Sequence, residues 1–167
     1  MTKKTIIKAR GVLKHGNKVL FCYNKLHNFF FLPGGTVKVE ENALICLHRE
    51  FNEECQLDIT VGSFLGCLEC HWKDEENIYQ EFNMIFNVYN VLGYIPDRIT
   101  STEPHISFSF LPYKKGVITS IYRILPIEIT EFLKPNGITS KYIADSQCRT
   151  SSRHITSASA SNINSSV

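Results

Sequence analysis

Alternating apolar and polar positions at the start of the chain predict a β-hairpin. Residues 5–13 and 18–23 are rich in apolar and β-branched side chains, and His15-Gly16-Asn17 between them is typical of a tight turn. A third short apolar run, residues 29–32, stops at Pro33-Gly34-Gly35, a sequence that interrupts strands. The pattern therefore predicts three strands before any helix.

A helical repeat follows in residues 42–55. Leu44, Leu47 and Phe51 fall within a narrow arc when residues are spaced by about 100° around a helix axis, which predicts one apolar stripe facing a core. Asn42 stands just before this repeat and has a side chain suited to an N-cap. We therefore expect a helix that begins at Asn42.

Strand patterns return after the helix, in residues 58–72 and 78–91. Asp74-Glu75-Glu76-Asn77 lies between the two runs and predicts a turn. In the second run apolar and polar residues alternate, so we expect one buried face and one polar face. The side chains expected to be buried are Ile78, Phe82, Met84, Phe86 and Val88, and those expected on the polar face are Glu81, Asn83 and Asn87.

After residue 91 the sequence predicts a loop, one short strand and a second helix. Residues 92–104 contain Pro96 and Pro104 and predict a loop, and residues 106–111 predict one more strand. Pro126 is suited to the first position of a second helix, which Pro135-Asn136-Gly137 would end.

The composition fits one globular domain with an additional C-terminal segment. The 167 residues are 43% hydrophobic and 20% charged, which argues against a disordered chain, a collagen and a coiled coil. Residues 140–167 contain nine serines and Tyr142 as their one aromatic residue, which predicts a disordered tail. We therefore expect a domain in residues 1–139 and a Ser/Thr-rich tail in residues 140–167.

Charge and targeting signals exclude several classes of protein. The formal net charge of +2 does not predict strong binding to nucleic acid or to a membrane surface. The chain has no run of about 20 apolar residues and no apolar region of a signal peptide, so we expect a cytoplasmic protein. Among the six cysteines, Cys67 and Cys70 have no second pair to complete a zinc site, which favours free thiols.

The charges are unevenly distributed along the chain. Residues 1–39 contain eight basic and no acidic side chains, whereas residues 40–54 contain five glutamates and one arginine. Glu50, Glu53 and Glu54 are spaced i, i+3, i+4, so they share one side of the predicted helix, where repulsion costs about 0.2–0.5 kcal/mol per close pair. Such carboxylates suit a hard divalent ion, Mg²⁺ or Mn²⁺, although three glutamates alone are more typical of an acidic face exposed to solvent. The longer pattern around them favours the metal site.

The segment from Gly35 to Leu57 resembles the signature of the Nudix hydrolase (MutT-like) family. That signature is Gly, five residues, Glu, seven residues, Arg-Glu, an apolar residue, any residue, Glu-Glu, any residue, Gly and an apolar residue. The matching positions are Gly35, Glu41, Arg49, Glu50, Phe51, Glu53, Glu54 and Leu57. One position departs, because Gln56 stands where the family has a glycine suited to a left-handed helix end, so strain is expected there.

The resemblance implies both a fold and an activity. The fold is α/β, the Nudix α/β/α sandwich with a mixed central β-sheet. The activity is hydrolysis of a diphosphate linkage in a nucleoside diphosphate derivative, with Mg²⁺ or Mn²⁺ as cofactor. The alternative is a catalytically inactive Nudix-fold module that binds a nucleotide or regulates a partner, although such modules usually lack box glutamates that this chain retains. The particular substrate is left open, and so is the choice between a monomer and a homodimer.

The resemblance also implies a metal site and the residues that orient it. The implied metal ligands are Glu50, Glu54, Glu53 and the backbone carbonyl of Gly35. Arg49 is implied as a catalytic residue, and with Glu41 it would orient the metal-binding carboxylates.

Residues outside the core of the motif are candidates for proton transfer and substrate binding. For the general base, Glu53 is the first choice, and Glu103 and Glu81 are alternatives from later in the chain. Lys8 and Arg10 share one face of the first predicted strand, where two roles are open: contact with substrate phosphates, or keeping the edge of the sheet soluble. Glu81 is also a candidate for the substrate-binding surface.

Overall fold

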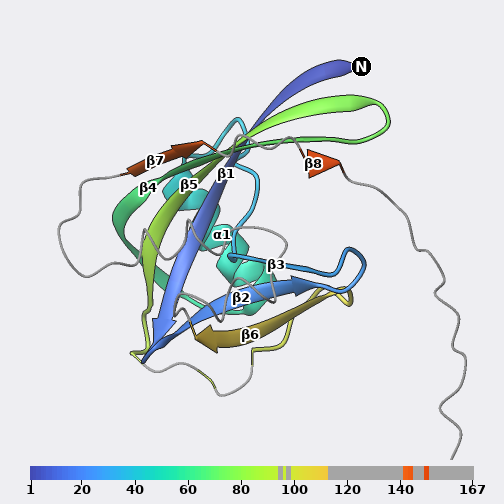
Figure 1. The fold of residues 1–167 in the computed structure, drawn as a ribbon. Coiled ribbons are helices and arrows are strands. Elements are labelled where there is room, and N and C mark those ends of the chain that lie inside the picture. Colours follow the sequence, from blue (N-terminus) through green and yellow to red (C-terminus); the bar gives the residue numbers. More distant parts are fainter. Residues whose placement is uncertain (94–95, 97–98, 113–140, 145–148, 151–167) are drawn as a thin grey trace, which may run out of the picture.

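The computed structural model describes residues 1–93, 96, 99–112, 141–144 and 149–150. Figure 1 shows a twisted sheet with one helix packed against it. The elements, in chain order, are β1 (Thr2–His15), β2 (Lys18–Asn24), β3 (Phe29–Phe31), α1 (Ala43–Cys55), β4 (Ile59–Lys73), β5 (Asn77–Asn90), β6 (Ile106–Pro112), β7 (Lys141–Ala144) and β8 (Arg149–Thr150). The hairpin, the helix and the strand near residue 106 thus lie where the sequence predicts them.

The sheet is mixed, as expected for the α/β class. Its strand order is β3-β2-β1-β5-β4-β7, with β6 paired to β2 and β8 paired to β4. β1 runs parallel to β5 from Thr2 opposite Asn77 to Leu13 opposite Val88, and β4 runs antiparallel to β5. After Leu13, β1 leaves β5 and pairs with β2, so β1 joins the two halves of the sheet.

Helix α1 covers one face of the sheet and forms a core with it. Phe51 packs so closely on β1 that a Cβ added at Gly11 would lie 2.6 Å from the ring. The buried helix residues are Cys46, Leu47, Phe51 and Cys55, whereas Leu44 is 46% exposed. The predicted stripe is therefore wrong at Leu44, because the buried face of the helix is centred on Cys46 and Leu47.

Two polar positions of β5 are buried, contrary to the alternation predicted from sequence, although Val88 is buried as predicted. Glu81 and Asn83 are almost fully buried, whereas Phe82, Met84 and Phe86 are only partly buried. β5 lies in the middle of the sheet, between β1 and β4. These polar side chains can be buried because two charged residues of β1 bond to them, Lys8 to Glu81 and Arg10 to Asn83.

Two short strands lie within the segment predicted to be a disordered tail. Lys141–Ala144 and Arg149–Thr150 both pair in parallel with β4. The prediction of disorder is therefore wrong for these residues, and the physical reason is that an open edge of β4 offers unpaired backbone groups. The predicted helix at Pro126 lies outside the described residues, and the domain boundary at residue 140 stays a prediction.

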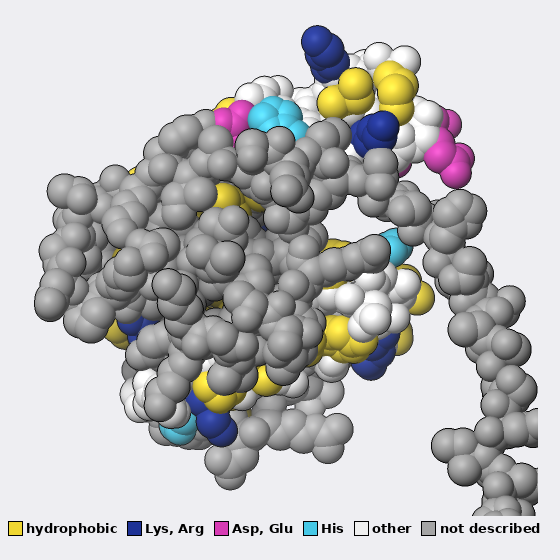
Figure 2. Space-filling model, viewed as in Figure 1, with side chains coloured by type: hydrophobic (Ala, Val, Ile, Leu, Met, Phe, Trp, Pro, Cys, Tyr) yellow, Lys and Arg dark blue, Asp and Glu magenta, His cyan; other side chains and the backbone are white. Residues whose placement is uncertain are grey.

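The ends of β1, β4 and β5 project from the body of the molecule (Figure 1). Lysine, acidic and hydrophobic side chains lie together on this projection (Figure 2).

Among the described residues no helix is long and apolar enough to cross a membrane.

Candidate active site

A short loop before the helix, here called the approach loop (residues 32–36), lies along β1. The backbone N–H of Gly11 donates to the Pro33 carbonyl over 2.9 Å, and that of Ala9 donates to the Gly35 carbonyl over 3.0 Å. Gly34 has φ of +123°, and a Cβ there would collide with the Ala9 carbonyl oxygen. Only glycine fits this position, so Gly34 fixes the path by which the chain reaches the motif.

Both ends of α1 are closed by specific hydrogen bonds. The Asn42 side chain accepts from the backbone N–H groups of Leu44 and Ile45, each over 3.0 Å, which confirms the predicted N-cap. At the other end Gln56 adopts the left-handed conformation with φ of 54° and ψ of 34°, and its N–H donates to the Asn52 carbonyl. Gln56 therefore takes the conformation that glycine would, at a cost of about 1 kcal/mol, and the helix continues unbroken as far as Cys55.

Arg49 connects three glutamates of the motif. Its guanidinium donates twice to Glu41, from Nε over 3.0 Å and from Nη2 over 2.6 Å. Its Nη1 donates to Glu50 over 2.7 Å and to Glu53 over 3.1 Å. The hydrogen bonds from Arg49 lower the pKa of Glu41 to about 2, so Glu41 is an anion over the whole physiological range. The structure thus brings together the pair that the sequence assigned to orienting the carboxylates.

Glu50 lies against the approach loop. A Cβ added at Gly35 would overlap the Glu50 carboxylate, so the absence of a side chain at Gly35 makes room for it. The Gly35 carbonyl, predicted as a metal ligand, accepts from the Ala9 N–H and from the Cys46 thiol over 3.7 Å. Gly35 therefore contributes space for Glu50 and an anchor to β1.

Glu54 is the most unusual carboxylate of the motif. Burial, with the nearby charge of Glu50, raises its pKa to about 7, and the field of Glu103 acts in the same direction. Arg10 and the N–H of Gly34, which donates to the Glu54 carboxylate, oppose this shift. The oxygen Oε2 of Glu54 is buried without a hydrogen-bond partner in the described part of the chain. A buried oxygen of this kind needs a partner, and a hard divalent cation is one that fits.

The third glutamate of the predicted metal site points elsewhere. The Glu53 side chain is 58% exposed and lies against Arg49. No group of three His, Cys, Asp or Glu side chains among the described residues is arranged to hold a metal ion. Glu54 is close enough to Glu50 for the charge of Glu50 to raise its pKa, whereas the more exposed Glu53 carboxylate is bonded to Arg49.

The loop before β6 brings Glu103 to the end of α1. Thr102 donates from its hydroxyl to the Glu53 carbonyl over 2.8 Å and from its N–H to the Glu54 carbonyl over 3.4 Å. The Glu103 carboxylate lies 3.3 Å from Nε2 of His105. Because its charge raises the pKa of Glu54, Glu103 is close enough to act on the same site.

The three predicted substrate-binding residues are instead bonded within the sheet. Lys8 forms an ion pair with Glu81 over 2.9 Å, and Trp72 donates to the same carboxylate over 3.2 Å. Burial acts against ionisation of Glu81, but Lys8 and a hydrogen bond from Asn83 keep its pKa below the usual value. Arg10 is buried and bonds to Asn83 and the approach loop.

The contacts inside the sheet favour a structural role for Lys8, Arg10 and Glu81, and their expected roles toward the substrate stay predictions. A carboxylate that already accepts from three donors is a poor general base, and a buried guanidinium is not presented to a phosphate. Sequence reasoning missed Asn83, which joins Arg10 to Glu81. The available signal was the placement of Glu81 and Asn83 two residues apart on one strand, matching Lys8 and Arg10 on another.

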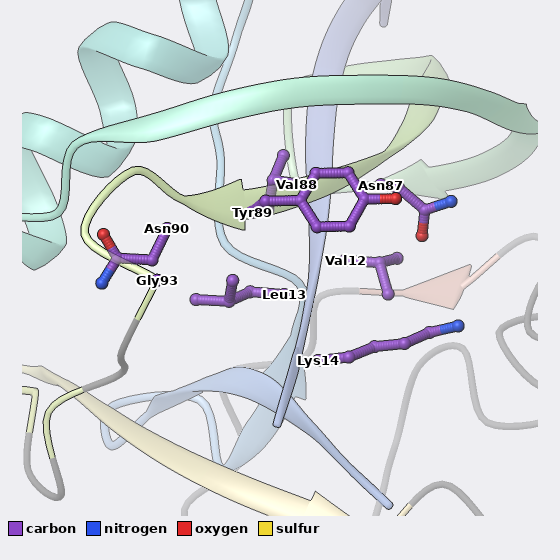
Figure 3. Close-up of a pocket in the computed structure, with 8 residues that line it drawn as sticks. All are labelled: Val12, Leu13, Lys14, Asn87, Val88, Tyr89, Asn90 and Gly93. Carbon is purple, nitrogen blue, oxygen red and sulfur yellow. The ribbon is translucent and has the colours of Figure 1, made fainter. Parts of the chain in front are cut away.

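A separate cavity opens where β1 and β5 diverge (Figure 3). It has a volume of about 320 Å³ and is lined by Val12, Leu13, Lys14, Asn87, Val88, Tyr89, Asn90 and Gly93. None of the residues that the sequence assigned to the site lines it, as far as the described chain extends.

Comparison with known proteins identifies the fold. No protein-family model matches the sequence, and no curated protein sequence does either. Among solved structures, the chain is similar to an ADP-ribose pyrophosphatase from Streptococcus suis, with a TM-score of 0.56 and 12% identity over 84% of this chain and 98% of that one. It is similar to a UDP-X diphosphatase, with a TM-score of 0.58 and 16% identity over 85% of this chain and 68% of that one.

A MutT protein from Methanosarcina mazei gives a TM-score of 0.57 and 21% identity over 79% of this chain and 92% of that one. Other similar structures are described as NUDIX hydrolases. The chain therefore has the Nudix fold, as the motif at residues 35–57 implied.

Proposed function

We propose that this protein is a divalent-metal-dependent hydrolase that cleaves a diphosphate linkage in a nucleoside diphosphate derivative. One observation carries the proposal: Glu54, at its place in the motif, has a buried carboxylate oxygen without a partner beside the Glu50 carboxylate. A structural helix would not keep two close carboxylates in this position, because burying an uncompensated charge is costly. Solved structures with the same fold include an ADP-ribose pyrophosphatase and a UDP-X diphosphatase, which supports this class of substrate.

Glu50 and Glu54 are the residues proposed to hold Mg²⁺ or Mn²⁺. Such an ion neutralises charge on a diphosphate and lowers the pKa of a bound water. Glu54 needs to lose its proton to act as a ligand, and a pKa of about 7 allows this at neutral pH. Arg49 donates hydrogen bonds to both Glu50 and Glu41. The Glu50 carboxylate is therefore oriented before a metal ion binds.

Glu53 is the proposed general base. It is one helical position from Glu54 and is exposed, so a water molecule can reach its carboxylate. Its bond to Arg49 restrains the side chain without burying it. Glu103 is the second candidate, because it comes from another element and yet lies close enough to influence Glu54.

The competing function is binding of a nucleotide without hydrolysis. The Nudix fold alone does not separate the two functions. The retained set of Glu41, Arg49, Glu50 and Glu54, with the bonds among them, favours hydrolysis, since a binding module has no need of a buried unpartnered carboxylate oxygen.

The test is a panel of nucleoside diphosphate derivatives assayed with Mg²⁺ and with Mn²⁺. ADP-ribose, UDP-sugars, dinucleoside polyphosphates and nucleoside triphosphates cover the main leaving groups. Glu54→Gln removes a ligand and is expected to lower kcat/KM by about 100-fold or more, whereas the matched charge change Glu75→Gln, on the exposed β4–β5 turn, leaves it unchanged. Binding of a nucleotide with no turnover of any compound would instead support the binding module.

A further inference from the structure

Arg10 is buried in the middle of the sheet, although arginine rarely is. It is 7% exposed and lies on β1, with its guanidinium carbon 5.2 Å from the ring centre of Phe31. Removing such a charge from water is costly unless hydrogen bonds compensate for it. The partners of Arg10 therefore indicate what the residue does.

Two of those partners are backbone carbonyls of the approach loop. Nη1 of Arg10 donates to the Leu32 carbonyl over 3.1 Å and to the Gly34 carbonyl over 2.6 Å. Nε donates to Asn83 Oδ1 over 3.2 Å, which holds the guanidinium in place from β5. The planar guanidinium of Arg10 thus joins the centre of the sheet to the approach loop.

Gly34 continues this connection to the metal-binding glutamate. Its carbonyl accepts from Arg10, and its N–H donates to the Glu54 carboxylate. The backbone at Gly34 lies directly against β1, because a Cβ added there would collide with the Ala9 carbonyl oxygen. One oxygen of Glu54 is thereby held by Gly34, and Oε2 is the one without a partner.

We infer that Arg10 is a positioning residue: it fixes the approach loop so that Gly34 holds Glu54 with its second oxygen turned to the metal site. This inference rests on the proposed function in that Glu54 is taken as a metal ligand. It replaces the substrate-binding role expected for Arg10 from sequence.

A purely structural role makes a different prediction. If Arg10 only filled the sheet, its replacement would lower global stability and leave the loop and the metal site unchanged in the folded fraction. Glu69 is the matched control, because it is 8% exposed, lies on β4 and has Gln80 as a hydrogen-bond partner. Glu69→Met and Arg10→Met each remove one buried charged side chain.

The experiment compares wild type, Arg10→Met, Arg10→Lys and Glu69→Met in two measurements that need no substrate. Hydrogen exchange of a peptide covering residues 32–37 reports the loop, and Mn²⁺ titration followed by electron paramagnetic resonance reports the metal site. Arg10→Met is expected to speed exchange in the loop and to raise the half-saturating Mn²⁺ concentration by about tenfold or more. Arg10→Lys retains a charge that reaches the carbonyls, so it is expected to restore part of the loop protection and part of the Mn²⁺ affinity. Glu69→Met is expected to change neither the loop exchange nor the Mn²⁺ affinity.

A third measurement separates positioning from substrate binding. For the substrate identified by the panel, Arg10→Met is expected to lower kcat with little change in KM, because Glu54 rather than a phosphate contact is affected. A rise in KM alone would restore the original substrate-binding role and overturn the inference.

The remaining outcomes are also decisive. The inference is overturned if Arg10→Met keeps wild-type exchange in the loop, or if the loop loosens while the Mn²⁺ titration stays unchanged. A wild-type protein that binds Mn²⁺ but hydrolyses nothing refutes the proposed function and leaves the inference to be decided by exchange and titration. A wild-type protein that binds no Mn²⁺ refutes both.

Discussion

The carboxylate of Glu50 occupies the space that a side chain at Gly35 would fill. These residues are the first glycine of the motif and the glutamate fifteen positions later, so the fold brings the two ends of this segment into contact. Arg49 donates to the same carboxylate over 2.7 Å. The Glu50 side chain is therefore held by contacts with the approach loop and with Arg49.

Gly35→Ala tests this confinement. The added methyl group displaces the Glu50 carboxylate, so we expect hydrolysis to fall by about 10- to 100-fold, as for other changes that misplace a ligand. Gly16→Ala is the control, because Gly16 has open space around it and lies in the β1–β2 turn. Because Gly16 has φ of +58°, Gly16→Ala is expected to lower the free energy of unfolding by about 1 kcal/mol and to leave activity unchanged. Equal activity of the two variants would show that Glu50 does not need this space.

The raised pKa of Glu54 predicts how stability depends on pH when metal is absent. Glu54 has a pKa of about 7 in the folded chain against 4.5 when unfolded. Between these values the folded state binds more protons than the unfolded state, so the free energy of unfolding falls as pH rises from about 4.5 to 7. At roughly 1.4 kcal/mol per unit of pKa, the loss from this group is about 3 kcal/mol.

Urea unfolding in EDTA at pH 5 and at pH 7.5 measures this loss. Glu54→Gln cannot ionise and is expected to remove most of the decrease, and saturating Mn²⁺ is expected to stabilise the wild type most at the higher pH. A wild type whose stability is flat or rising over this range, with Glu54→Gln behaving identically, would contradict the assignment of a raised pKa to Glu54.

Gln56 provides a prediction about stability alone. Because it adopts the left-handed conformation, Gln56→Gly relieves strain at the helix end, while the greater freedom of glycine in the unfolded chain offsets part of the gain. We expect a net increase of about 0.5–1 kcal/mol in the free energy of unfolding. Activity is expected to stay at the wild-type level, since the helix already keeps its register. A destabilised Gln56→Gly would mean that the Gln side chain makes a compensating contact.

Most of the fold follows from local sequence patterns. The hairpin, the N-cap at Asn42 and the helix through residue 55 depend on neighbours in the chain, and the structure has them where the pattern predicts. The two faces of β5 could not be predicted this way. Glu81 and Asn83 are buried because Lys8 and Arg10, more than 70 positions away, pair with them. Alternation gives the period of a strand, but which face is covered depends on strands that are distant in sequence.

The candidate site likewise contains features that local sequence predicts and features that depend on residues distant in sequence. The spacing of Arg49, Glu50 and Glu54 on one helix made their proximity predictable. The association of Arg49 with Glu41, which precedes the helix, was implied only by the family resemblance. The role of Arg10 was not predictable. A basic residue on a strand suggests a phosphate contact, and only the three-dimensional structure shows that the guanidinium is buried against the approach loop.

The choice of general base can be tested by a pair of isosteric substitutions. If Glu53 is the base, Glu53→Gln lowers kcat by about 100- to 10,000-fold, the range that general-base catalysis contributes. Glu103→Gln removes a carboxylate from the same region and is then expected to have a much smaller effect. The reverse order of the two losses would assign the base to Glu103. Both variants should bind Mn²⁺ nearly as the wild type does, which distinguishes loss of the base from loss of the metal.

The most direct measurement is cleavage of a nucleoside diphosphate derivative by the wild-type protein with Mg²⁺ or Mn²⁺, with EDTA, and by Glu54→Gln with the same metal. The account predicts hydrolysis of the diphosphate linkage that needs the metal and falls by about 100-fold or more when Glu54 is changed. Hydrolysis that persists in EDTA, or that Glu54→Gln performs as fast as the wild type, would contradict it.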